Sequence, residues 1–120
     1  MKTIKELIVE KDIPVVISDH NGFITYVNKS FEEIFGWNKN EVTGKPLTLI
    51  IPKKLHDSHN LGFSRFLTTS MPTLLNKPLN LKAVTKDGRE IDSEHIIIAE
   101  RENGKWVFGA TIRPLDKEKQ

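Results

Sequence analysis

The stretch that decides the fold is V-V-I-S-D-H-N-G-F-I-T-Y-V-N, residues 15–28. Two short runs rich in β-branched and aromatic residues flank Asn21-Gly22, a pair that favours a tight hairpin turn. The stretch therefore predicts two strands, which a tight turn forces to be antiparallel. Asn28 follows the second strand directly, where its side chain is placed to cap a helix.

Outward from this hairpin, helical and extended segments alternate. The pattern of residues 3–10 predicts a short helix with Thr3 as its N-cap. Residues 79–85 alternate apolar and polar side chains, and K-D-G and E-N-G turns then join two further strands. This order predicts an α+β fold, with a five-stranded antiparallel sheet and short helices packed on one face. We expect an N-terminal flanking helix at 1–12, the main domain at 13–115 and a charged tail at 116–120.

The bulk composition excludes several classes of function. A chain of 120 residues with 38% hydrophobic and 28% charged residues fits one ordinary globular domain. The net charge of +2 gives no argument for nucleic acid or for an anionic membrane. The absence of cysteine excludes thiol chemistry and disulfides. With no apolar run of membrane-spanning length and no signal-peptide core, we expect a cytoplasmic location.

The segment after Pro52 offers chemistry as well as packing. Read as a helix, I-P-K-K-L-H-D-S-H-N-L-G-F-S-R-F places four residues on one face, namely Leu55, His59, Phe63 and Phe66. A histidine on an apolar, inward face is either an inert core residue or an axial ligand to a haem iron. Position alone leaves both interpretations open.

Four motifs together resemble those of PAS sensor domains. They are residues 15–28, F-E-E-I-F-G-W-N-K-N-E-V-T-G-K-P (31–46), K-D-G-R-E-I (86–91) and G-A-T-I-R-P-L (109–115). The resemblance implies a PAS fold and a role in sensing and signal transduction. It also implies partners: a second copy in a homodimer, and a downstream output domain or partner protein.

Within that family, residues 51–69 resemble the haem-binding branch, which contains the oxygen-sensing nitrogen-fixation kinases and the direct oxygen sensors. His59, seven residues after Pro52, matches the proximal ligand of that branch. Arg65 matches an arginine that pairs with a haem propionate, and Phe66 matches the aromatic residue after it. The resemblance implies that haem b binds through His59 and senses a diatomic gas or a redox state. The alternative is a dimerisation module that either has no cofactor or binds a small molecule or a flavin (FAD or FMN).

Strand alternation assigns one wall of the expected pocket. Leu79 and Leu81 should face inward, and leucine at position 79 cannot donate the hydrogen bond that an arginine gives oxygen in the related kinases. On the next strand, acidic residues mark the outward set, so Ser93, His95 and Ile97 should point inward. His95 is then a hydrogen-bonding distal residue, a second axial ligand to iron, or a core histidine.

On the last strand, periodicity and resemblance disagree. Periodicity puts Trp106 and Phe108 inside, whereas the resemblance turns Gly109 toward the pocket and Trp106 outward; we follow the resemblance. The outer face of the sheet would then be apolar and need a cover. The N-terminal stripe of Ile4, Leu7 and Ile8 or a second subunit would provide it, and we predict a homodimer through this face.

The candidate cofactor-binding residues are therefore Leu55, His59, Phe63, Arg65, Phe66, Leu74, Leu79, Leu81, His95, Ile97 and Gly109. The metal ligands among them would be His59 and, on the distal side, His95. The chain shows no Gly-rich phosphate loop, nucleophile elbow or metalloprotease helix, so we assign no catalytic residues and expect no enzyme.

Overall fold

The computed structural model describes residues 2–69 and 75–115, and for residues 62 and 64–69 it describes the backbone alone. It contains an antiparallel sheet with the strand order β2-β1-β5-β4-β3. The strands are β1 (Val15–Ser18), β2 (Ile24–Val27), β3 (Leu79–Val84), β4 (Glu90–Glu102) and β5 (Lys105–Pro114). The helices are α1 (Ile4–Val9), α2 (Lys29–Phe35), α3 (Lys39–Val42) and α4 (His56–Thr69), with 3₁₀ turns at Leu47–Ile50 and Lys53–Leu55. The predicted α+β fold with five antiparallel strands is confirmed.

The hairpin turn forms as the sequence predicts, because Asp19 organises it. The Oδ1 atom of Asp19 accepts hydrogen bonds from the backbone N–H groups of Asn21 at 2.9 Å and Phe23 at 3.0 Å. Gly22 completes the turn with φ at 82°, a left-handed conformation that glycine adopts without steric cost. The turn places β1 and β2 side by side at one end of the sheet.

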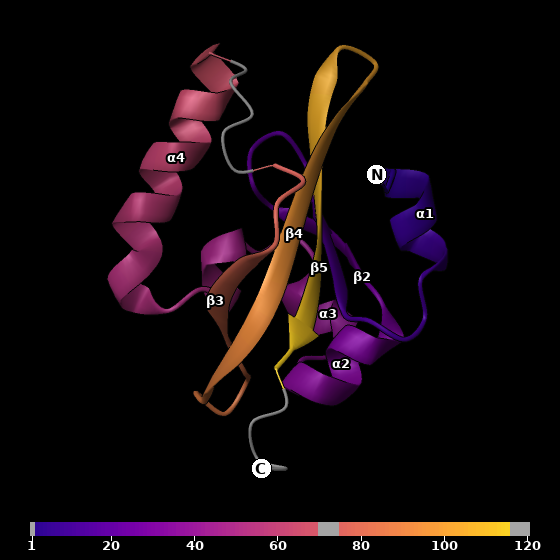
Figure 1. Ribbon diagram of the computed structural model, residues 1–120, viewed down its shortest axis with the longest axis vertical. Coiled ribbons are helices and arrows are strands. Elements are labelled where there is room, and N and C mark those ends of the chain that lie inside the picture. Colours follow the sequence, from indigo (N-terminus) through magenta and orange to yellow (C-terminus); the bar gives the residue numbers. More distant parts are fainter. Residues whose placement is uncertain (1, 70–74, 116–120) are drawn as a thin grey trace.

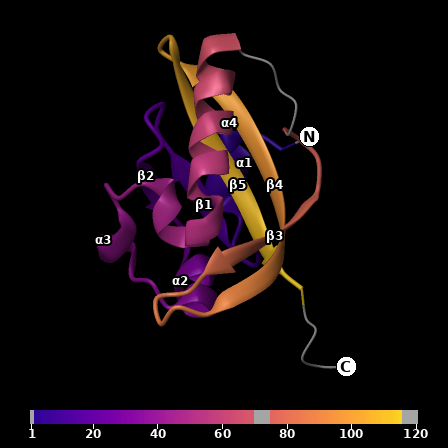
Figure 2. The same cartoon turned by 90° about the vertical axis from the view of Figure 1, so that its left-hand side faces the viewer.

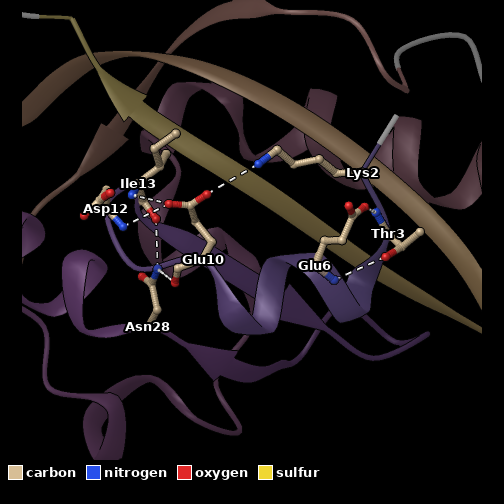
Figure 3. Close-up of polar contacts among 7 residues, drawn as sticks. All are labelled: Lys2, Thr3, Glu6, Glu10, Asp12, Ile13 and Asn28. Carbon is tan, nitrogen blue, oxygen red and sulfur yellow. Dashed lines mark hydrogen bonds and ion pairs between the residues drawn. The ribbon is translucent and has the colours of Figure 1, made fainter.

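Asn28 ties three segments together just after this hairpin, and Figure 3 shows its contacts with Glu10 and Ile13. Its Oδ1 atom accepts hydrogen bonds from the N–H groups of Val15 on β1 and Phe31 in the first turn of α2, each at 3.0 Å. Its Nδ2 group donates to the carbonyl oxygens of Glu10 at 3.1 Å and Ile13 at 2.8 Å. The side chain is only 6% exposed, so it caps α2 and fixes the linker from α1 to β1 at once.

Glu10 holds the same linker from its other side. Its carboxylate accepts hydrogen bonds from the N–H groups of Asp12 at 2.9 Å and Ile13 at 3.1 Å, and pairs with Lys2 at 3.4 Å (Figure 3). The hydrogen bonds from the Asp12 and Ile13 backbone lower the pKa of this carboxyl below its ordinary value. The path from α1 into the sheet is therefore pinned by polar contacts on both sides.

The sheet separates two apolar clusters, and Figure 1 shows α4 and α1 on opposite sides of it. On the inner face, α2 and α4 pack against the sheet, and the cluster there contains Val16, Ile24, Val27, Phe31, Phe35, Val42, Ile50, Ala83 and Ile112. On the outer face, α1 packs, and the cluster contains Ile4, Leu7, Val15, Ile17 and Ile98. Because α1 covers the outer face, the predicted pocket belongs to the inner face.

The prediction that Gly109 faces the pocket is wrong. Gly109 lies under α1, where a Cβ atom would stand 2.6 Å from Leu7 Cδ1 and 2.8 Å from Ile4 Cδ1. The neighbouring Phe108 points to the inner face, and Trp106 stacks on it with ring centroids 6.5 Å apart. The assignment from strand periodicity, with Trp106 and Phe108 on the inner face, is correct, because side chains alternate along β5.

The expected cover of the outer face is present within the chain itself. Ile4 is 4% exposed and Leu7 is 1% exposed, whereas Ile8 is 50% exposed and does not take part. A helix of six residues can turn only a narrow stripe toward the sheet. A homodimer through this face stays a prediction.

The α-helix after Pro52 begins later than the sequence predicts. A 3₁₀ turn over Lys53–Leu55 precedes α4, which starts at His56. His56 Nε2 donates a hydrogen bond of 2.7 Å to the carbonyl oxygen of Ile51, which fixes the entry into the helix. None of the helices in the described part of the chain combines the length and the apolar character that a membrane crossing requires.

We expect Asn28→Ala to lower the free energy of unfolding by about 3 kcal/mol or more, because it strands the buried N–H groups of Val15 and Phe31. The matched control is Asn38→Ala, which changes the exposed N-cap residue of α3 and should cost about 1 kcal/mol or less. Urea denaturation of both variants measures the difference. Equal losses would show that Asn28 has no special role.

Candidate functional site

Helix α4 lies across the inner face of the sheet, over β5 and the β1–β2 turn (Figure 2). Among the described side chains of α4, Phe63 contacts the sheet: its ring centroid lies 4.9 Å from that of Phe108 on β5. The same ring comes within 3.4 Å of the position that a Cβ atom of Gly22 would take. Gly22 thus serves the turn and also leaves room for the aromatic side chain that seats α4.

His59 stands one helical turn before Phe63, and the two rings stack with centroids 5.9 Å apart. The histidine is partly buried. Burial, and to a smaller extent the neighbouring His56, lowers the pKa of His59 below its ordinary value of 6.5. The imidazole is therefore neutral near pH 7, the form in which histidine binds a metal.

His95 points to the inner face, as strand alternation predicts. Its cross-strand partners are Ile112 on β5, a core residue of the inner face, and Leu79 on β3. Ser93 Oγ lies 2.8 Å from His95 Nε2. Burial lowers the pKa of His95 to about 4, so this ring too is neutral at pH 7.

The other predicted residues divide into three groups. Leu79, Leu81 and Ile97 lie on the inner face, since they pair with His95, Ser93 and Ala110. Leu55 and Leu81 line a shallow hollow of about 260 Å³ at the edge of β3, where Leu81 is 38% exposed. Leu74 and the side chains of Arg65 and Phe66 lie outside what the structure describes.

Two inner-face aromatic residues were missed in the sequence-based site, namely Phe108 and Trp106. Phe108 is 7% exposed and touches α4 through Phe63. Arg101 of β4 stacks over the Trp106 ring at 4.7 Å from its centroid, a cation–π contact. The alternation of side chains between the two faces of β5 would have identified both residues as inner-face residues.

The arrangement combines aromatic side chains with an imidazole on the inner face of the sheet. Phe63 and Phe108 offer aromatic surface, and His59 offers a neutral imidazole. Nowhere in the described residues do three or more His, Cys, Asp or Glu side chains come together as a site for a bare metal ion.

Comparison with known proteins identifies the family. The PAS fold family matches residues 5–113, nearly the whole chain, and the chain belongs to this family. PAS domains are sensory and signalling modules, and the five-stranded antiparallel sheet with its short helices is their fold.

Two curated relatives and one solved structure illustrate the likeness. An uncharacterized protein from Azorhizobium caulinodans is 31% identical over 102 residues, covering 84% of this chain and 14% of that protein. Sensor protein FixL from Bradyrhizobium diazoefficiens is 25% identical over 107 residues, covering 88% of this chain and 21% of FixL. The PAS domain of an HTR-like protein from Haloarcula marismortui superposes with a TM-score of 0.69 at 18% identity, covering 93% of this chain and 88% of that one. The chain thus spans less than a quarter of either curated relative.

Acid should destabilise the fold through His95. Its unfolded form takes up a proton below pH 6.5, whereas the folded form does so only near pH 4, so stability falls as the pH drops through this window. We expect His95 alone to lower the free energy of unfolding by about 2 kcal/mol between pH 7.5 and pH 5. Urea denaturation at both pH values should show a flatter profile for His95→Gln. The same slope in both proteins would mean that His95 is not buried.

Proposed function

We propose that this PAS domain binds haem b through His59 and senses a diatomic gas or a redox state. The observation that carries the proposal is the partly buried, neutral imidazole of His59 beside the aromatic surface of Phe63. The 25% identity to sensor protein FixL across 88% of the chain supports the same assignment.

The described residues fit a haem in their chemistry. A haem needs one imidazole nitrogen for its iron and apolar walls for its ring, and His59, Phe63 and Phe108 supply groups of these kinds. Arg65 would pair with a propionate, as the resemblance implies. A bound haem would supply an iron that takes up diatomic gases and changes its oxidation state.

His95 is the residue that would meet a gas molecule on the other side. In the related kinases an arginine at the position of Leu79 holds oxygen, and leucine cannot do so. Leu79 and His95 are direct cross-strand partners on the same face, which places their Cβ atoms about 5 Å apart. His95 therefore supplies, from the neighbouring strand, the polar group that Leu79 lacks.

A second candidate function is a module that holds no cofactor or a small molecule such as a flavin. The observation that favours it is Phe63, whose ring already fills the space between Gly22 and Phe108. In that case His59 is a core histidine, and the inner face serves packing alone.

In either case we propose that the domain acts in a homodimer and passes its signal to an output domain or partner protein. The chain spans 14% and 21% of the two curated relatives, so in those proteins other regions accompany this domain. Occupancy of the pocket shifts the signalling state only if the ligand binds one conformation more tightly than the other.

The test is an absorption spectrum after addition of one equivalent of haem, with wild type, His59→Ala and His56→Ala side by side. We expect a sharp Soret band in the wild type that is shifted or lost in His59→Ala. His56→Ala is the matched control, because His56 lies on the same helix but is bonded to the Ile51 carbonyl, and its Soret band should match the wild type. A band that survives His59→Ala unchanged would refute ligation by His59, and a wild type without a specific band would leave the cofactor-free module.

A further inference from the structure

Ser93 and His95 form a polar pair on the inner face of β4. Ser93 is 0% exposed, and its Oγ lies 2.8 Å from His95 Nε2. The other acceptors within reach of the hydroxyl are the carbonyl oxygens of Ile91 at 3.3 Å and Leu81 at 3.4 Å. The neighbours of His95 across the sheet, Leu79 and Ile112, are both apolar.

A serine hydroxyl has one proton, and its direction decides the tautomer of the ring. If the Ser93 proton points to Nε2, the imidazole carries its own proton on Nδ1. If the Ser93 proton points to a carbonyl, Nε2 carries the ring proton instead. The short contact is to Nε2, which is a stronger base than a peptide carbonyl oxygen, and the two carbonyl contacts are 0.5 Å or more longer (3.3 and 3.4 against 2.8 Å). The geometry favours donation from Ser93 to Nε2.

The other ring nitrogen of His95, Nδ1, forms no hydrogen bond with the residues that the structure describes. When a hydrogen bond holds one nitrogen of a neutral imidazole, the held side determines whether the other nitrogen offers a proton or a lone pair to a ligand.

We propose that Ser93 is a positioning residue that holds His95 in the Nδ1–H tautomer, so that His95 presents a hydrogen-bond donor to a ligand on the inner face. The proposal deepens the proposed function and rests on it for the place of the ligand. It assigns the class of ligand: a molecule with a hydrogen-bond acceptor at this point, such as the outer atom of a diatomic gas. It also excludes His95 as a second axial ligand through Nδ1, because a proton occupies that lone pair.

The experiment is a long-range ¹H–¹⁵N correlation spectrum of the histidine rings in the full chain without haem, near pH 7.5. The low pKa of His95 keeps its ring neutral there, so the tautomer is defined. His95→Gln assigns the signals. We expect the Nδ1–H pattern for His95 in the wild type, and a shift of the tautomer ratio by roughly tenfold toward Nε2–H in Ser93→Ala, as expected for the loss of one hydrogen bond.

Two further variants separate positioning from packing. Ser93→Thr keeps the hydroxyl and should keep the wild-type tautomer. Ser18→Ala removes another buried strand serine, whose hydroxyl bonds to the Asp19 carbonyl, and should leave His95 unchanged. An Nε2–H pattern in the wild type, or an unchanged ratio in Ser93→Ala, would overturn the proposal. Since no haem is needed, an Nδ1–H wild type without any Soret band would remove the haem and leave the role of Ser93 standing.

Discussion

The structure depends first on the buried amide of Asn28. Its oxygen accepts two hydrogen bonds and its nitrogen donates two, so the side chain has no unused polar atom. Such a fully satisfied group specifies one arrangement of its partners, because any other leaves buried N–H or C=O groups unpaired. Here the partners are the linker after α1, the start of β1 and the start of α2. The hairpin that follows carries Gly22, on which Phe63 seats α4.

The middle strand β5 contacts a helix on each face of the sheet. Phe108 supports α4 through Phe63, and the adjacent Gly109 admits α1 through Ile4 and Leu7. Two neighbouring residues of β5 therefore pack against α4 on one face and α1 on the other. Phe63 and α1 thus contact opposite faces of the same strand at adjacent residues.

Local chemistry made most of the fold predictable. The Asn-Gly turn, the Asn28 cap and the alternation of β3 and β4 each follow from short-range rules, and the outward acidic residues correctly turned His95 inward. Gly109 could not be placed this way, since its role is to leave room for α1, a helix about a hundred residues away in sequence. On β5, strand periodicity predicts the face of Gly109 correctly and the family resemblance does not.

The site was predictable only in part, for a similar reason. Alternation brings Ser93 and His95 to one face, but their hydrogen bond depends on side-chain rotamers that a sequence pattern does not encode. The packing of Phe63 on Gly22 joins segments about forty residues apart and has no signature in either. The pairing of Leu79 with His95 required the register of β3 on β4, which the turn length determines and the structure displays.

We propose that a ligand binds between α4 and the inner face of the sheet. Isoleucine δ1-methyl NMR tests it directly, because isoleucines lie on both faces: Ile97 and Ile112 inside, Ile17 and Ile98 outside. On addition of one equivalent of ferric haem, whose paramagnetic iron broadens nearby nuclei most, we expect the inner methyl signals to shift or broaden while the outer ones change little. Unchanged inner signals, or larger changes at Ile17 and Ile98, would contradict it.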